Sequence, residues 1–281
     1  MRYRVRMGTN RVRATLVGSL LSLAIAALLA NPALAGSTAL PAQVSALYRV
    51  SFGLLGEIGY FRFNSTVNGE AYALAAEAKI DTAVFDYFGA MTSMGSVLAT
   101  VTKPGGYQFR YKQKAILGKK KRRSLDMAFD GSGVKDVTFV PPDPPSKKAI
   151  PVTKDQLKQV LDPLSGVMAL SIGNIAEPCR QKLPIFDGKQ RFDLVFSPTG
   201  RSDGADQVCH VRLVPISGHK EGEGAASVIN GNIEVVMRPV PKANILIPYR
   251  VTVPTIIGAA VLASDKIEIT MPDQKRIAFK R

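Results

Sequence analysis

Residues 61–80 have the sequence FRFNSTVNGEAYALAAEAKI, in which apolar and polar side chains alternate in two runs. Alternation with a period of two is typical of a β-strand that buries one of its faces. Between the runs stands Asn68-Gly69, a strong signal for a tight hairpin turn. This stretch therefore predicts two antiparallel strands joined by a short loop, and it sets the expectation for the rest of the chain.

The strand pattern recurs on both sides of this hairpin. A second hairpin is predicted around Asp187-Gly188, between residues 183–186 and 189–196. Further strands are expected at 46–52, 107–114, 122–129, 207–215, 232–238, 245–253 and 266–270. Strands that return through tight turns pair in antiparallel fashion, so we expect an antiparallel sheet.

Two helices are expected in the middle of the chain. Thr153 and Gln156 form a capping box, which predicts a helix over residues 154–161. Asp162 is a good N-cap, and proline and glycine bound a second helix over 164–172. This second helix is apolar nearly all round, which indicates burial. The expected fold class is mainly β: a curled antiparallel sheet, or an open β-barrel or spiral, wrapped around a short buried helix.

Residues 1–35 have the pattern of a signal peptide. An arginine-rich leader precedes the apolar run 16–30, and Ala33 and Ala35 form a small-x-small cleavage site. A retained membrane anchor is the alternative, but a spanning helix needs about 20 apolar residues. No adjacent arginine pair precedes the apolar run, so we expect the general export route. Cleavage leaves 36–281 as a single β-rich periplasmic domain, which we do not expect to span the membrane.

The positive charge of the chain is concentrated in one segment. The formal net charge of +15 falls to +10 without residues 1–35, which carry five arginines and no acid. Most of the remainder lies between residues 103 and 123, where basic and aromatic residues alternate. Lysines protect an exposed sheet edge, but they also attract anionic phospholipid or lipopolysaccharide. The candidate contact residues are Arg110, Lys112, Lys114, Lys119, Lys120, Lys121, Arg122 and Arg123. We expect no nucleic-acid partner, because the protein is exported.

The two cysteines, Cys179 and Cys209, are predicted to form a disulfide, since an even count in an oxidising compartment favours one. A zinc site with His210 and His219 is the alternative. Cys209 and His210 are adjacent, and on a strand their side chains point to opposite faces, which disfavours a shared metal. We therefore expect no metal and no cofactor.

Catalytic signatures are absent from the sequence, which contains no metalloprotease motif, nucleophile elbow or phosphate-binding loop. Neither histidine has an obvious catalytic partner, so we expect no enzyme activity. Asp187, Arg191 and Asp193 form a possible polar cluster at the mouth of a barrel. The alternative is that these residues stabilise the turn itself, with an ion pair between Arg191 and Asp193 or with neighbouring residues.

Several motifs occur in an order that resembles the bacterial domain-of-unknown-function family 3108. They include residues 48–54 (YRVSFGL), 161–165 (LDPLS), 185–194 (IFDGKQRFDL) and 209–212 (CHVR). The resemblance covers about residues 43 to 255 and implies an exported, β-rich protein without an established activity. The chain is also similar, more weakly, to open-barrel envelope proteins that include periplasmic lipoprotein carriers.

These observations leave three hypotheses for function. The first is a non-catalytic periplasmic protein that supports the cell envelope by binding an envelope component, either a lipid or an envelope protein. The second is a carrier of lipid or another apolar ligand inside an open barrel. The third is a hydrolase of envelope polymers. The side chains expected to line a carrier cavity are Phe61, Phe63, Leu74, Ala76 and Ala78. A cavity beside the helix at 164–172 favours the carrier, and a packed interior favours the first hypothesis.

Overall fold

The computed structural model describes the chain except residues 1–38, 116–117, 119, 221–228, 230 and 281. The predicted signal peptide therefore lies outside the described residues. The described residues form one compact unit. Its strands are β1 (Gln43–Phe52), β2 (Glu57–Asn68), β3 (Ala71–Asp81), β4 (Phe85–Leu98), β5 (Val101–Ala115), β6 (Lys121–Asp130), β7 (Gly133–Val140), β8 (Lys182–Phe186), β9 (Arg191–Asp203), β10 (Asp206–Ser217), β11 (Ile233–Val240), β12 (Ile245–Thr255), β13 (Gly258–Thr270) and β14 (Arg276–Lys280). The helical elements are α1 (Pro163–Ile172) and the 3₁₀ turns η1 (Gly53–Leu55), η2 (Asp155–Leu157) and η3 (Pro241–Ala243).

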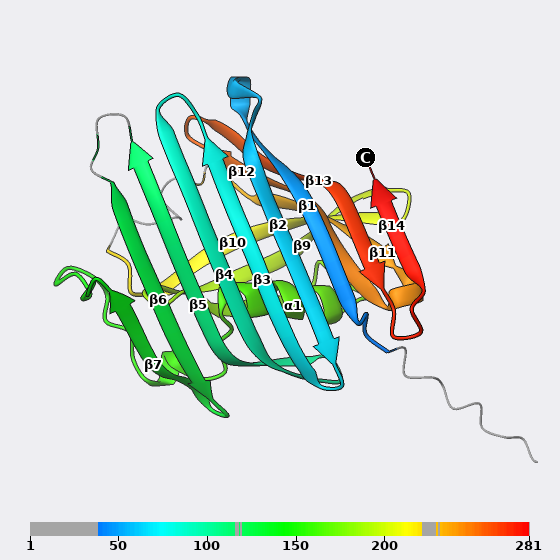
Figure 1. Ribbon diagram of the computed structural model, residues 1–281, viewed down its shortest axis with the longest axis horizontal. Coiled ribbons are helices and arrows are strands. Elements are labelled where there is room, and N and C mark those ends of the chain that lie inside the picture. Colours follow the sequence, from blue (N-terminus) through cyan, green and yellow to red (C-terminus); the bar gives the residue numbers. More distant parts are fainter. Residues whose placement is uncertain (1–38, 116–117, 119, 221–228, 230, 281) are drawn as a thin grey trace, which may run out of the picture. The chain divides into compact units, whose positions relative to one another are not determined.

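All the strands belong to one antiparallel sheet, which confirms the predicted fold class (Figure 1). Strands β1 to β7 form one meander, and β8 to β13 form a second. The two meanders join where β1 pairs with β13 along its whole length. The sheet curls so that α1 contacts β3, β4 and β5 as well as β8 and β12.

The helix α1 lies between the two meanders and contacts strands of both. Leu164, Met168 and Ile172 are spaced four residues apart and pack into the core formed mainly by β1, β3, β6, β12 and β13. Leu170 points the other way and packs against a second core formed by β8 to β12. A helix covered by apolar side chains on both sides needs no polar face, so the burial predicted for 164–172 is confirmed.

The prediction of a helix over residues 154–161 was wrong. The capping box forms: the Thr153 amide donates to the Gln156 side chain, and the Gln156 amide donates to the Thr153 side chain. The helix nevertheless stops after the single turn η2. The following residues include a turn at Gln159, which has φ of +53°, and they connect the two free edges of the sheet. Lys158 bridges to Gly133 of β7, and Leu161 bridges to Ile185 of β8. Pairing with both edges outweighs the local helix signal.

Most predicted strands are confirmed within a few residues of their expected bounds. The first hairpin is shifted by one residue, because Asn68 pairs with Ala71 and the turn consists of Gly69 and Glu70. Gly69 has φ of +59°, as expected at the first position of a type II′ turn. Strands β4, β7 and β14 were not predicted.

Candidate functional site

A wedge opens in the sheet where β13 changes its partner. The first half of β13 pairs with β12, through Arg250–Thr255, and the second half pairs with β14. Between the halves, Asp265 forms a bulge, since Leu47 pairs with Lys266 and Tyr48 with Ser264. A bulge bends a strand and increases its twist. The start of β12 is therefore unpaired on the side of β13 and separates from it.

A pocket of about 240 Å³ lies in this wedge beside α1. It is bounded by β1 and β2, by the start of β12 and by the second half of α1. The lining side chains are almost all apolar: Leu40, Pro41, Val44, Ala46, Tyr48, Phe61, Phe63, Ser65, Val67, Val167, Met168, Ser171, Ile172, Ile245, Leu246, Ile247, Pro248, Val251 and Leu262. Phe61, Phe63 and Leu262 are among those that stay half-exposed. The pocket suits an apolar ligand.

Three hydroxyl groups are the polar side-chain atoms of this lining. They belong to Tyr48, Ser65 and Ser171. None makes a side-chain hydrogen bond to another residue in the described part of the chain. The Tyr48 ring packs against Phe61 with centroids 6.0 Å apart, and burial raises the pKa of its hydroxyl. The phenol is neutral at physiological pH, so the pocket offers neutral hydrogen-bonding groups and no charge.

The helix that forms one wall is fixed by a buried polar network. Asp162 accepts hydrogen bonds from the backbone amides of Leu164 and Ser165 at 3.0 Å, and from the hydroxyls of Ser165 and Ser93. The Tyr72 hydroxyl lies 2.7 Å from Ser165 Oγ. Asp162 and Ser165 are fully buried. The network joins the start of α1 to β3 and β4, and thereby sets the position of the pocket wall.

Burial raises the pKa of Asp162, although its four hydrogen bonds oppose the shift. Protonation of this carboxyl therefore stabilises the folded state. The stabilisation by protonation is complete below the ordinary carboxyl pKa and is lost as the pH rises through the raised pKa. We expect wild type to gain stability relative to Asp162→Asn when the pH falls from about 7 to about 5. Urea denaturation of both proteins at each pH measures this difference, and a difference that is constant with pH would contradict the shift.

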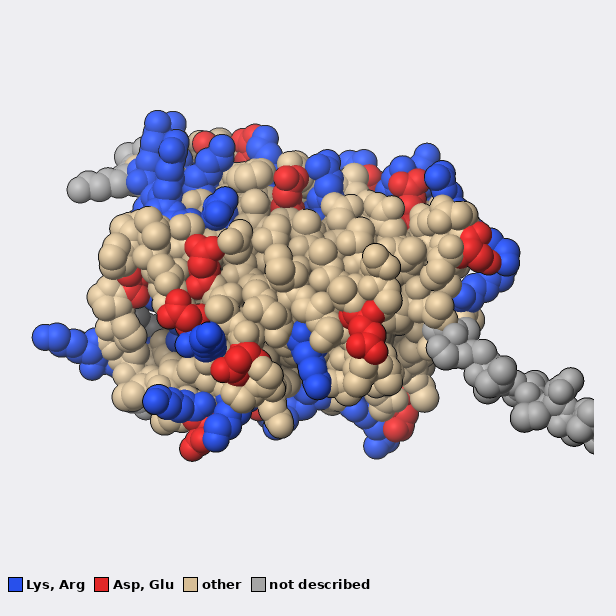
Figure 2. Space-filling view, turned by 60° about the horizontal axis from the view of Figure 1, so that its bottom comes forward, with Lys and Arg blue, Asp and Glu red and all other residues tan. Residues whose placement is uncertain are grey.

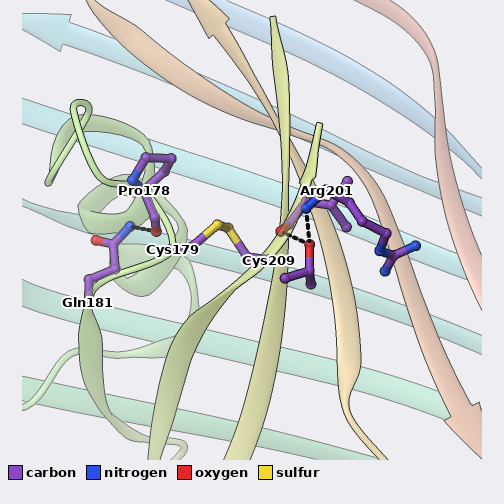
Figure 3. The surroundings of a disulfide bond; sticks show 7 residues. Pro178, Cys179, Gln181, Arg201 and Cys209 are labelled. Carbon is purple, nitrogen blue, oxygen red and sulfur yellow. Dashed lines mark hydrogen bonds between the residues drawn. A yellow bond between two sulfur atoms is a disulfide. The ribbon is translucent and has the colours of Figure 1, made fainter. Parts of the chain in front are cut away.

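The predicted disulfide is confirmed. Cys179 lies in the loop after α1, Cys209 lies on β10, and their Cα atoms are 5.1 Å apart (Figure 3). Gln181 donates to the Pro178 carbonyl at 2.7 Å and holds the loop beside the bond. Both cysteines are buried in the second core, and neither is free to bind zinc. Within the described residues, no cluster of histidine, cysteine or acidic side chains is suited to a metal ion.

The predicted polar cluster divides into a pair and a separate residue. Arg191 and Asp193 form an ion pair on β9, with Nη1 and Oδ1 2.6 Å apart and both side chains about one-tenth exposed. Arg191 also donates to the Gln156 carbonyl, and Lys182 Nζ lies 3.5 Å from Asp193. Asp187 accepts hydrogen bonds from two backbone amides of its own loop and forms no hydrogen bond or ion pair with Arg191 or Asp193 in the described part of the chain. Burial raises the pKa of its carboxyl. These contacts stabilise the β8–β9 connection.

The predicted basic residues lie at one end of β5 and β6, at the upper left in Figure 2. Arg123 differs from the others, because it is half-buried and forms an ion pair with Asp143. Lys119 lies outside the described residues. The remaining six are exposed and form no ion pair within the described part of the chain. This set, called the basic hairpin below, is Arg110, Lys112, Lys114, Lys120, Lys121 and Arg122.

Sequence reasoning missed most of the pocket. Of the five side chains expected to line a cavity, Phe61 and Phe63 do so. Leu74 and Ala76 are buried in the first core, and Ala78 is half-buried away from the pocket. The useful signal was at residues 245–247, three consecutive apolar residues that do not alternate. Such a run indicates a strand covered on both faces, here by the pocket and the second core.

The comparisons with known proteins give a family. No curated protein matches the sequence. A crystal structure of a β-barrel-like protein of the domain of unknown function DUF1849 from Brucella abortus is similar, with 12% identity and a TM-score of 0.47, over 82% of this chain and 99% of that chain. The described residues contain no helix long and apolar enough to cross a membrane. The sequence matches the family "Protein of unknown function (DUF3108)" over residues 47–263, and the chain therefore belongs to the DUF3108 family.

Proposed function

We propose that this protein binds an apolar component of the cell envelope, a lipid acyl chain, in the pocket beside α1. The observation that carries the proposal is the pocket lining, which is apolar except for the hydroxyls of Tyr48, Ser65 and Ser171. An apolar cavity of about 150 Å³ holds one benzene ring, so this larger pocket holds a chain segment on the order of ten carbons. Binding is driven by the removal of apolar surface from water.

The proposed location is the periplasm. The predicted signal peptide at residues 1–35 and the disulfide between Cys179 and Cys209 both fit an oxidising compartment. A periplasmic protein with an acyl-binding pocket has access to envelope lipids. This combines the first two hypotheses, because the envelope component that is bound is the apolar ligand.

We propose binding without catalysis. His219 and Asp143 line the same hollow of about 810 Å³, which brings an acid and a histidine to one site. The Asp143 carboxylate is bound by Arg123 and Lys189, and His219 Nδ1 is buried without a hydrogen-bond partner in the described part of the chain. A catalytic carboxylate orients its histidine by a hydrogen bond, and this pair has none.

Filling the pocket tests the proposal. Ser171 lines it from α1 and is half-exposed, so Ser171→Phe places a ring in the space for the ligand. We expect wild type to bind decanoate and the apolar dye N-phenyl-1-naphthylamine, and the variant to bind both at least tenfold more weakly. Dye fluorescence and its displacement by decanoate measure both affinities.

The matched control is Ser197→Phe on β9, at an exposed position outside the pocket. This variant should bind like wild type, and circular dichroism checks that both variants are folded. Native mass spectrometry of protein released gently from the periplasm, followed by solvent extraction, identifies the natural ligand. A wild-type protein that binds neither probe, or a Ser171→Phe variant that binds both normally, contradicts the proposal.

A further inference from the structure

The ends of the strands form two further edges of the sheet, which run across the strands and are distinct from the edge strands β7 and β8. Four large aliphatic side chains project from one of these edges. Leu54 and Leu55 form η1 between β1 and β2, with exposed fractions of 107% and 67%. Ile256 and Ile257 form the turn between β12 and β13, with exposed fractions of 70% and 78%. Single exposed aliphatic residues are ordinary, but four on two neighbouring turns mark an interaction surface. We call these four residues the aliphatic tips.

Both turns are held in fixed conformations next to each other. The Phe52 amide donates to the Gly56 carbonyl at 2.9 Å, and Gly53 and Gly56 have φ of +45° and +68°. The Thr255 hydroxyl donates to the Gly258 carbonyl at 2.6 Å and closes the second turn. A Cβ on Gly258 would lie 3.7 Å from the Gly53 Cα atom. These hydrogen bonds and backbone conformations hold the aliphatic tips in their exposed positions.

The same edge carries the basic hairpin. In an antiparallel meander, the β1–β2, β3–β4 and β5–β6 connections all lie at one edge (Figure 1). Strands are about 5 Å apart, so the β5–β6 end lies about 20 Å along this edge from η1. Val84, 58% exposed, stands on the β3–β4 turn between them. Apolar and cationic side chains thus occupy neighbouring positions along one edge.

Repulsion between charges of the basic hairpin destabilises the isolated protein. Lys112 pairs directly with Arg122 across β5 and β6, on the exposed face. Like charges at such positions destabilise a sheet. Within the described part of the chain, Lys112 Nζ lies 5.2 Å from the centroid of the Phe88 ring. This contact supplies no negative charge. An external anion would relieve the repulsion.

Acidic side chains at this edge do not neutralise the basic hairpin. Glu57 binds Arg49 at 2.9 Å, and Asp81 binds Lys79 at 3.0 Å. Asp86 lies opposite one lysine of the hairpin in the register of β4 and β5, without a hydrogen bond or ion pair in the described part of the chain. The edge therefore keeps an excess of positive charge.

We infer that this edge is a docking surface for an anionic lipid membrane. The aliphatic tips insert among the acyl chains, and the basic hairpin contacts the phospholipid headgroups. A soluble polyanion would satisfy the cations but leave the aliphatic tips in water, so the combination favours a lipid surface. The inference does not depend on the pocket, because Val44 and Val67 of the pocket lie toward the other end of β1 and β2.

Vesicle co-sedimentation tests the docking surface with the full mature protein. Wild type should bind vesicles of phosphatidylglycerol and phosphatidylcholine, and bind pure phosphatidylcholine vesicles much more weakly. Leu54→Ser with Leu55→Ser should weaken binding at least tenfold at low and at high salt. Lys120→Gln with Lys121→Gln should weaken binding about fivefold per lysine at low salt, and less at high salt.

Matched variants at other surfaces provide the controls. Leu98 and Val101, 51% and 55% exposed, flank the β4–β5 turn at the opposite edge, and changing both to serine should leave binding unchanged. Lys147→Gln with Lys148→Gln removes two exposed lysines elsewhere. No binding by wild type, or equal losses in the matched controls, would overturn the proposal. Binding that is insensitive to Leu54→Ser with Leu55→Ser would also overturn it, because the contact would then involve no insertion.

Discussion

Replacing Asp162 by alanine should lower the free energy of unfolding by about 4 kcal/mol. The change removes the N-cap of α1, which contributes about 1–2 kcal/mol. It also removes the carboxyl acceptor of the buried hydroxyls of Ser93 and Ser165, at about 1–3 kcal/mol for each hydrogen bond lost, while the two hydroxyls stay 3.0 Å from each other. Relief of the cost of burying the carboxyl offsets part of this loss, so the total is smaller than the sum.

Urea denaturation followed by far-ultraviolet circular dichroism measures the effect, since the chain contains no tryptophan. Asp162→Asn keeps an acceptor for the hydroxyls and should lose much less stability. Asp155→Ala is the matched control, because Asp155 is 85% exposed and forms a surface ion pair with Lys158. That change should cost less than about 1 kcal/mol. If Asp162→Ala and Asp155→Ala cost the same, the buried network does not hold α1.

Removing the disulfide should lower the free energy of unfolding by about 3.5 kcal/mol on the chain-entropy model. The bond closes a loop with a sequence separation of 30 residues, from Cys179 to Cys209. That loop contains β8, a five-residue edge strand of the sheet. Without the bond, β8 and the end of α1 keep only their packing and their hydrogen bonds to β9 and to residue 161.

The double variant Cys179→Ala with Cys209→Ala is preferred to serine, because both positions are buried in an apolar core. Urea denaturation of this variant and of wild type, with and without reductant, measures the contribution. Reductant should lower the stability of wild type toward that of the variant and leave the variant unchanged. Hydrogen exchange should accelerate most in β8. A loss below about 1 kcal/mol would show that packing alone secures this region.

The local signals in the sequence predicted the architecture well. Alternation over 61–80 gave a hairpin that differs from the observed one by a single residue at the turn. Asp162 and Pro163 marked the start of α1 correctly. Strand β4 was not predicted because it contains Gly89 and Gly95, which weaken the sequence pattern of a strand. In the structure a Cβ on Gly95 would lie 2.6 Å from the Tyr72 hydroxyl, so close packing explains that glycine.

Features that depend on distant residues were not predictable in this way. Ser93 on β4, a partner of Asp162, lies about 70 residues earlier in the chain, and Tyr72 on β3, a partner of Ser165, lies about 90 residues earlier. The pocket depends on the bulge at Asp265, where β13 exchanges β12 for β14. The capping box at Thr153 correctly predicted a local turn and wrongly predicted a longer helix, because the next residues bridge to β7 and β8 instead of continuing the helix. Each of these features is set by tertiary contacts, which local periodicity does not encode.

Among the described strands, every ladder joins strands that follow one another in the chain, except the ladder between β1 and β13. Each meander can therefore grow from contacts close in sequence, which form quickly. The exceptional ladder pairs Gln43 with Thr270 and must wait until nearly the whole chain is available. We expect it to be the slow step of folding, so the protein stays incompletely folded until its C-terminal strands have emerged. The proposed export, in which the chain would cross a membrane before it folds, would benefit from that delay.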